Sequence, residues 1–236
     1  MDPTAEGDPA ARTTAPLLRL EAVSKTYSES SVDRQVLRDV SLDLPRGEMT
    51  SLTGVSGSGK STLISVVAGL MLPDSGRVFF DGDEITGLDD VARARLRALR
   101  VGVVLQSGNL IPFLTALQNV ELAMELGGRD RDKEHAMGLL SELGLGRRLH
   151  HVPRRMSGGE AQRVSVAMAL ANDPTLLLAD EVTGQLDSAN AEQVIGVIFD
   201  AWRRRGLTVL FVTHNGELAA RAEHRLVLEG GEVRGL

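Results

Sequence analysis

The stretch Gly54-Val-Ser-Gly-Ser-Gly-Lys-Ser-Thr62 has the spacing G-x-x-x-x-G-K-[ST], which gains meaning only in a particular structural context. Residues 48–53 before it have the partly β-branched character of a short strand, and residues 60–70 after it form a helix-compatible apolar run. A strand, a glycine loop and a helix in this order bring backbone N–H groups and the positive end of a helix to one point. The stretch therefore predicts a phosphate-binding loop.

Each residue type in this loop has its own expected task. Lys60 supplies a compact positive charge for the outer phosphates, and the Ser61 hydroxyl is placed to ligate Mg²⁺. The alternative, a glycine-rich turn with an exposed lysine, is disfavoured because the whole chain holds only three lysines. The residues predicted to hold the nucleotide phosphates are Gly54, Ser56, Gly57, Ser58, Gly59, Lys60, Ser61 and Thr62.

The composition bounds the class of protein. A chain of 236 residues with 42% hydrophobic and 25% charged residues is long enough for one large α/β domain with a sizeable core. A net charge of −6 argues against a nucleic-acid partner, because no basic excess is present to neutralise phosphates. The absence of cysteine excludes disulfides and thiol chemistry.

Neither end of the chain nor its interior predicts a membrane anchor. Residues 1–16 are polar and rich in Pro, Ala and Thr, so we expect a disordered tail, neither a secretory signal nor a lipidation site. The longest apolar runs, such as residues 209–212, are far too short to span a bilayer.

Two alternating segments precede the phosphate-binding loop. Residues 17–27 and 36–44 have the alternation of strands, and we expect an antiparallel β layer that covers the nucleotide. Tyr27, the only tyrosine, ends the first segment. It either stacks on a base or is a half-buried strand residue. Residues 88–100 carry four arginines, for which a solvated helix face is favoured over a basic docking patch.

The second half of the chain alternates between helices and strands. Strands are expected at residues 101–106, 175–180, 207–213 and 225–229, with a helix over residues 190–204. Residues 107–174 instead carry long helical patterns without a convincing strand. The predicted fold is α/β: a core of residues 17–106 and 175–236 with a mostly parallel sheet and a small antiparallel β subdomain, and a helical subdomain inserted over residues 107–174.

Polar residues follow several of these strands. Because ligands of open α/β sheets bind at the carboxyl ends of the strands, these residues should meet the phosphate-binding loop. Asp180 can hold Mg²⁺ and Glu181 can polarise the water that attacks the γ-phosphate. Gln106 can sense both the Mg²⁺ and the water, and His214 can contact the γ-phosphate. Without a phosphate-binding loop, an Asp-Glu pair here would be a plain helix cap.

A second anion-binding pattern lies at Ser157-Gly-Gly-Glu160, which precedes the apolar helical run 164–171. A serine hydroxyl and the N–H groups of a helix start can hold a phosphate. Two phosphate sites in one domain would be redundant. We therefore expect a head-to-tail homodimer, in which each Ser157 closes on the ATP bound by the other chain.

The order of these motifs now matches a known family. The matching elements are the phosphate-binding loop, Gln106, Ser157-Gly158-Gly159-Glu160, Leu176–Asp180 with Glu181, Leu186-Asp187 and His214. This order resembles that of ABC-type ATPase subunits, over nearly the whole chain from Leu17 to Gly230. The resemblance implies ATP and Mg²⁺ as ligands, Tyr27 as the adenine-stacking aromatic, Asp187 as the subunit-interface aspartate and His214 as the switch histidine.

Residues 106–120, together with Thr183-Gly-Gln-Leu-Asp187, are similar to the lipoprotein-release and macrolide-export branch of that family. This similarity implies an ATPase that powers a separate membrane permease from the cytoplasmic face of the cell membrane. The alternative is a regulatory ATPase, similar to the cell-division member of the branch, that signals through a membrane partner without transport. A DNA-repair ATPase is disfavoured, because the chain has no room for a coiled-coil insertion.

Some residues depart from the family pattern. Met156 and Glu160 stand where Leu and Gln are usual, Val182 replaces a proline, and Met168 replaces an arginine. All reactive groups are kept, so activity is expected, while Val182 and Met168 bear on rate and on communication between subunits. The apolar residues after Gln106 either form a groove for a permease helix or the core of the helical subdomain. They are Leu110, Ile111, Phe113 and Leu114.

Overall fold

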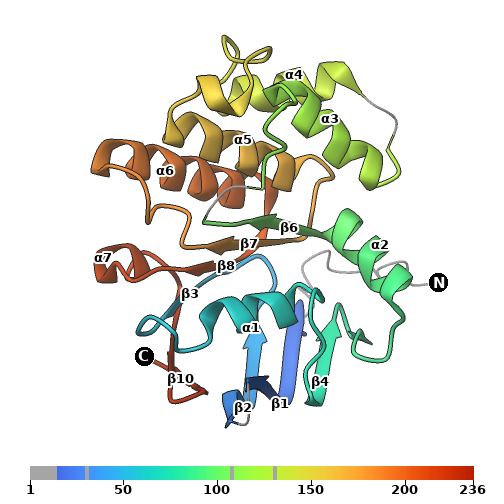
Figure 1. Ribbon diagram of the computed structural model, residues 1–236, viewed down its shortest axis with the longest axis vertical. Helices are drawn as coiled ribbons and strands as arrows, with labels where there is room; N and C mark the ends of the chain where they lie inside the picture. The colour runs from blue at the N-terminus through green and yellow to red at the C-terminus, as the bar shows by residue number, and fades with distance from the viewer. Residues whose placement is uncertain (1–14, 30–31, 107–108, 130–131) are drawn as a thin grey trace, which may run out of the picture.

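Two β-sheets and a layer of helices build the fold (Figure 1). The structure is a computed structural model that describes residues 15–29, 32–106, 109–129 and 132–236. The expected tail over residues 1–16 lies outside these ranges except for its last two residues. Within the described ranges, no helix is both long and apolar enough to cross a membrane.

The larger sheet has six strands in the order β10-β9-β3-β8-β7-β6. Their bounds are β3 (Met49–Thr53), β6 (Val101–Val104), β7 (Leu176–Asp180), β8 (Thr208–Val212), β9 (His224–Glu229) and β10 (Glu232–Gly235). All neighbouring pairs are parallel except β9 and β10. The mostly parallel sheet is thus confirmed. The edge strand β10 was not predicted, although the Gly230-Gly231 turn before it, with positive φ at both residues, is typical of a hairpin.

The central strands are buried on both faces, and their side chains alternate between two cores. Leu177 and Ala179 of β7 belong to a core shared with the helices. Leu176 and Leu178 of the same strand belong to a second core on the opposite face. Strands with two covered faces are apolar at nearly every position, and the run Leu-Leu-Leu-Ala follows this rule.

The smaller sheet is antiparallel, and the second core lies between it and the large sheet. Its order is β2-β1-β4-β5, with β1 (Leu18–Glu29), β2 (Val32–Leu44), β4 (Ser75–Phe80) and β5 (Asp83–Glu84). The predicted antiparallel layer is confirmed. Helix α1 (Lys60–Val67) lies between the two sheets, and its apolar residues such as Leu63 and Val67 are fully buried (Figure 1).

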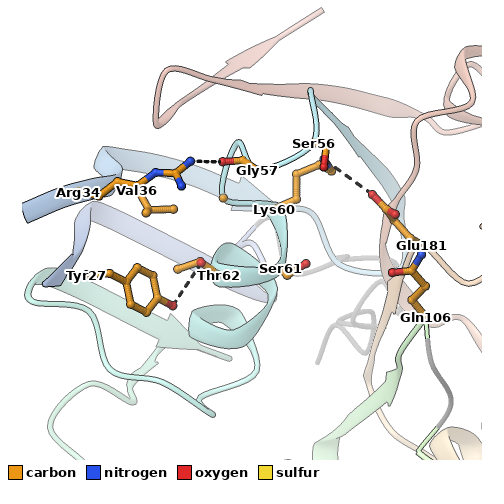
Figure 2. Close-up of a pocket in the computed structure, with 11 residues that line it drawn as sticks. Tyr27, Arg34, Val36, Ser56, Gly57, Lys60, Ser61, Thr62, Gln106 and Glu181 are labelled. Atoms are coloured by element: carbon orange, nitrogen blue, oxygen red, sulfur yellow. Dashed lines mark hydrogen bonds and ion pairs between the residues drawn. The ribbon is translucent and has the colours of Figure 1, made fainter. Parts of the chain in front are cut away.

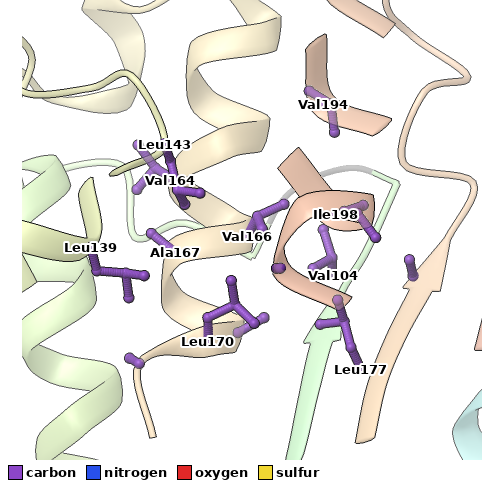
Figure 3. Close-up of a cluster of buried hydrophobic side chains, with 14 of the residues drawn as sticks. Val104, Leu139, Leu143, Val164, Val166, Ala167, Leu170, Leu177, Val194 and Ile198 are labelled. Carbon is purple, nitrogen blue, oxygen red and sulfur yellow. The ribbon is translucent and has the colours of Figure 1, made fainter. Parts of the chain in front are cut away.

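Helices cover the other face of the large sheet. They are α3 (Ala116–Leu126), α4 (Lys133–Glu142), α5 (Gly158–Leu170) and α6 (Ser188–Arg205), with η1 (Pro153–Arg155) before α5 and the short α7 (Gly216–Ala219) after β8. As predicted, the described residues between β6 and β7 hold helices and no strand. One apolar core runs from α4 through α5 to α6 and the sheet (Figure 3). The division of residues 107–174 as a separate subdomain therefore stays a prediction.

The arginines of α2 (Asp90–Arg100) do not form the expected solvated face. Arg93 is only 9% exposed and donates to the Leu88 carbonyl and to Asp90. Arg97 donates to the Gly69 carbonyl at 2.7 Å, and Arg100 forms an ion pair with Asp81 at 2.8 Å. Arg93 thus binds the start of its own helix, whereas Arg97 and Arg100 hold α2 against its neighbours.

Asn119 of α3 fixes the loop that precedes its own helix. Its side chain is fully buried, accepts from the Ile111 N–H at 2.8 Å and donates to the carbonyls of Leu114 and Thr115 at 3.1 and 3.0 Å. An Asn119→Leu substitution keeps the size of the side chain but leaves buried backbone groups unpaired. We expect a loss of about 3 kcal/mol in the free energy of unfolding, measured by urea denaturation.

The matched control is Glu121→Leu, two residues further along the same helix, where the side chain is only partly buried and accepts no such bonds from the residues that the structure describes. It should change the unfolding free energy by less than about 0.5 kcal/mol. Equal stability of the two variants would contradict the role of Asn119.

Candidate functional site

A cavity of about 550 Å³ lies where the two sheets and α1 meet (Figure 2). Nine of the predicted site residues line it: Tyr27, Ser56, Gly57, Gly59, Lys60, Ser61, Thr62, Gln106 and Glu181. They come from β1, from the loop after β3, from the start of α1 and from the ends of β6 and β7. The carboxyl edge of the sheet thus gathers the side chains as its topology requires.

Glycine is a steric necessity in the phosphate-binding loop. Gly54, Gly57 and Gly59 have φ values of +150°, +75° and +109°. A β-carbon on Gly54 would lie 2.4 Å from the Leu228 carbonyl oxygen, and one on Gly59 would lie 2.7 Å from a methyl group of Val36. The loop therefore passes between β9 and β2 in a conformation that no side chain permits.

The ammonium of Lys60 lies inside the loop. The side chain is 6% exposed, and its Nζ donates to the carbonyls of Gly54 and Val55 at 2.9 and 3.0 Å. It also lies 3.8 Å from a carboxylate oxygen of Glu181. Gly54 and Ser58 do not line the cavity and instead form the back of the loop. The buried Ser58 hydroxyl finds no hydrogen-bond partner among the described residues.

Asp180 is the last residue of β7 and is 9% exposed. Burial raises the pKa of its carboxyl, and the negative charge of Glu181 adds to this, while the nearby Ser61 hydroxyl and Lys60 ammonium oppose it. Its Oδ1 atom is buried without a hydrogen-bond partner in the described part of the chain. A buried, unpaired carboxylate oxygen beside a hydroxyl suits a hard cation such as Mg²⁺.

Glu181 has a strained backbone, with φ at +47°. The next turn brings it close to two other predicted residues. A β-carbon on Gly184 would lie 3.1 Å from the Gln106 amide nitrogen, 3.5 Å from the Glu181 carbonyl and 3.9 Å from the His214 ring. Gln106, Glu181 and His214 therefore surround Gly184, although His214 itself is exposed and does not line the cavity.

Tyr27 has features of both alternatives drawn from the sequence, a platform that stacks on a base and a half-buried strand residue. It is 36% exposed and lines the cavity, as a stacking platform must. Its hydroxyl also lies 3.3 Å from both the Thr62 hydroxyl and the Met71 sulfur, which holds the ring against α1. Its contact with adenine stays a prediction.

The Ser157-Gly-Gly-Glu160 element does not line the cavity. Ser157 caps α5 in a capping box, accepting from the Glu160 N–H at 3.1 Å while Glu160 accepts from the Ser157 N–H at 3.0 Å. The Ser157 N–H and the Arg148 guanidinium lower the pKa of Glu160. A β-carbon on Gly159 would lie 2.5 Å from the Asn190 side chain, and Gly158 approaches Leu186.

Asp187 caps the following helix. It accepts from the Asn190 N–H at 2.9 Å and from the Asn190 amide at 2.6 Å, and these bonds lower its pKa. Its carboxylate lies at the start of α6, beside the residue that packs on Gly159. The local role of Asp187 is thus a helix cap, and an interface role stays a prediction.

Three residues near the site were not predicted from the sequence. Arg34 and Val36 of β2 line the cavity, and only the pairing of β2 with β1 brings them there. Gln162, 6% exposed, donates from its amide to the Leu105 carbonyl at 3.1 Å and so ties α5 to the residue before Gln106. No local motif signals these contacts, because each joins segments far apart in the chain.

An apolar groove of about 480 Å³ lies between α2, β6, α3 and α5. Its lining includes Leu70, Leu105, Leu126 and Met168. None of the four apolar residues predicted for a groove lines it. Leu110 packs against the core that the large sheet shares with the helices. Ile111 and Leu114 are half-buried, and Phe113 is 77% exposed. These four residues therefore lie outside this hollow, and whether they form a groove for a permease helix stays a prediction.

Comparison with known proteins decides the family. A family model described as ABC transporter matches residues 37–184. The chain belongs to this family and is an ATPase of it. The lipoprotein-releasing system ATP-binding protein LolD of Shewanella oneidensis is 41% identical, over 92% of this chain and 96% of its own length. The uncharacterized ABC transporter ATP-binding protein YbbA of Escherichia coli is also 41% identical, with the same coverage.

The fold agrees with a solved member of this family. The dimeric structure of the ATP-binding cassette MJ0796, in a post-hydrolysis state with ADP and Pi, superposes with a TM-score of 0.87. It is 37% identical, and the alignment covers 93% of this chain and 97% of that one. The predicted ABC ATPase fold is confirmed.

The buried charge of Asp180 predicts a pH-dependent cost to stability. Its folded-state pKa is raised, so the ionised group destabilises the fold above that pKa, and the cost disappears as the pH falls toward the unfolded value. An Asp180→Asn chain without nucleotide should therefore melt at a higher temperature than the parent at pH 7.5. Thermal unfolding monitored by circular dichroism should show this difference shrinking toward pH 4.5. A lower melting temperature at pH 7.5 would contradict the argument.

Proposed function

We propose that ATP binds in the 550 Å³ cavity with its base against Tyr27 and its β- and γ-phosphates in the loop over residues 54–62. The convergence of the loop, Glu181 and Gln106 on one cavity supports this placement, and Asp180 lies behind them, next to Ser61 and Lys60. Ser61, Asp180 and Gln106 would hold Mg²⁺, which supplies positive charge to neutralise the phosphate oxygens. Among the described residues no cluster of three His, Asp or Glu side chains forms a metal cage. Ser61, Asp180 and Gln106 therefore suit a Mg²⁺ site in which phosphate oxygens of the nucleotide supply the remaining ligands.

Within this placement each side chain has one task in hydrolysis. Lys60 binds the outer phosphates, and Glu181 accepts a hydrogen bond from the water that attacks the γ-phosphate in line. The strained backbone of Glu181 aims its carboxylate toward Lys60 and the cavity. Gln106 and His214, which both approach Gly184, contact the water and the γ-phosphate.

We also propose that the hydrolytic site is completed by a second copy of the chain. Ser157, Gly158, Gly159 and Glu160 lie outside the cavity of their own chain but keep an exposed helix start. A two-fold dimer would bring this helix start onto the nucleotide of the partner. Asp187 lies next to the same element through Asn190, so it would face the same interface.

Replacing the proposed base separates binding from turnover. A Glu181→Gln chain should bind Mg²⁺-ATP yet lose at least about a hundredfold in turnover, because the amide cannot take up the proton of water. It should also elute as a dimer with ATP and as a monomer without it. Phosphate release and size-exclusion chromatography with light scattering provide the measurements.

The control is Glu217→Gln, which makes the same chemical change at an exposed residue of α7. It should keep the turnover of the parent. Hydrolysis at the parent rate by the Glu181→Gln chain would disprove the role of Glu181.

We propose that the chain powers a separate membrane permease of the lipoprotein-release type from the cytoplasmic face of the membrane. The similarity to LolD supports this partner. The 480 Å³ groove offers the docking surface: its lining is mainly apolar, and its Leu126 and Leu70 are 71% and 57% exposed. Met168, where the family usually carries arginine, adds an apolar wall.

A regulatory ATPase that signals through a membrane partner is the second candidate. The 41% identity to YbbA, whose role is uncharacterized, leaves room for a task other than lipoprotein release. Both candidates need a membrane partner, so the test is whether ATP hydrolysis by the purified complex moves a lipoprotein out of the membrane.

A charge in the groove should disrupt docking without affecting the nucleotide site. We expect Leu126→Asp to abolish co-purification with the membrane permease, while the ATPase rate of the isolated subunit stays within twofold. Val91→Asp is the control, since Val91 is 79% exposed and lies outside the groove lining. Loss of the permease with both variants would argue against the groove.

A further inference from the structure

Arg34 is a cation of the cavity that the proposed hydrolysis does not use. It lies on β2 directly opposite Tyr27 of β1, and its side chain turns toward the phosphate-binding loop (Figure 2). One guanidinium nitrogen donates to the Gly57 carbonyl at 2.9 Å. The side chain is exposed, so burial in the core does not explain its position.

The charge of Arg34 has no carboxylate partner among the residues that the structure describes. The neighbouring Asp33 accepts a hydrogen bond from Ser28 at 2.7 Å instead. Lys60, the other cation of the cavity, lies 3.8 Å from Glu181. A single bond to Gly57 uses one of the five N–H donors of the guanidinium, so most of its donors stay available.

The position of Arg34 in the cavity indicates which part of the nucleotide it would contact. Tyr27 marks the base end of the cavity, and Lys60 marks the end of the outer phosphates. Arg34 reaches from the strand register of Tyr27 to Gly57 in the loop, which places it between these two ends. The part of ATP between its base and its outer phosphates is the ribose and the α-phosphate.

We propose that Arg34 is a further nucleotide-binding residue, whose guanidinium binds the α-phosphate of the bound nucleotide. This assignment rests on the proposed placement of ATP in the same cavity. A planar, permanently charged donor matches a phosphate better than a ribose hydroxyl. Arg34 contacts the α-phosphate, which hydrolysis leaves unchanged, so it holds ATP and ADP alike and affects affinity without directing the attack of water.

The test compares ligands that differ by one chemical group. Dissociation constants of ATP and ADP are measured by calorimetry, and those of AMP and adenosine by displacement of labelled ADP. Arg34→Ala should weaken ATP, ADP and AMP by a similar factor of about ten, because all three carry the α-phosphate. Adenosine, which lacks phosphate, should bind the variant and the parent equally. Arg34→Gln, whose shorter side chain keeps N–H donors but carries no charge, should behave like Arg34→Ala.

Arg38→Ala is the matched control, because Arg38 is an exposed arginine four residues along the same strand and outside the cavity. Equal ADP affinity of the Arg34→Ala and Arg38→Ala chains would overturn the assignment. An equal loss for adenosine would place the contact on the nucleoside and overturn the α-phosphate. If the parent binds no nucleotide, or if Lys60→Ala leaves ADP binding unchanged, the placement of ATP itself fails and this assignment fails with it.

Discussion

The close approach of the phosphate-binding loop to its two neighbouring strands constrains the rest of the site. The backbone at Gly54 passes against the Leu228 carbonyl of β9, and Gly59 passes against Val36 of β2. These contacts fix the loop relative to both sheets at once. The loop can therefore present N–H groups at one point only because the parallel sheet and the antiparallel sheet hold it from opposite sides. The same constraint sets the position of the cavity, the start of helix α1 and the placement of the Lys60 ammonium.

The site keeps two features that cost stability. Asp180 holds a buried carboxylate whose pKa is raised by desolvation, and Glu181 adopts a backbone conformation that non-glycine residues rarely take. Neither feature helps the chain to fold. The surrounding strands β7 and β8, which are fully buried along their length, offset these costs. Functional groups placed at the end of such strands are held rigidly, as in-line hydrolysis requires.

The Ser157 element is a local structure to which we assign a second, proposed role at a dimer interface. Within its own chain it is a complete capping box, supported by Arg148 on Glu160. At the same helix start, Ser157 and Gly158 are exposed and lie outside the cavity of their own chain. Gln162 on this helix binds the carbonyl before Gln106, so movement of α5 is mechanically linked to one wall of the cavity. This bond offers a path between the proposed dimer interface and the proposed hydrolytic residues.

Local chemistry in the sequence determined much of this protein. The glycine spacing, the buried strands at residues 175–180 and 207–213 and the polar residue after each strand predicted the parallel sheet and nine cavity residues, because each depends on neighbours in the chain. The tertiary structure alone decided the rest. Arg34 reaches the cavity through cross-strand pairing, Arg97 and Arg100 of α2 bind residues outside their own helix, and an apolar groove forms between α2, β6, α3 and α5. These outcomes depend on contacts between distant segments, whose partners no local pattern specifies.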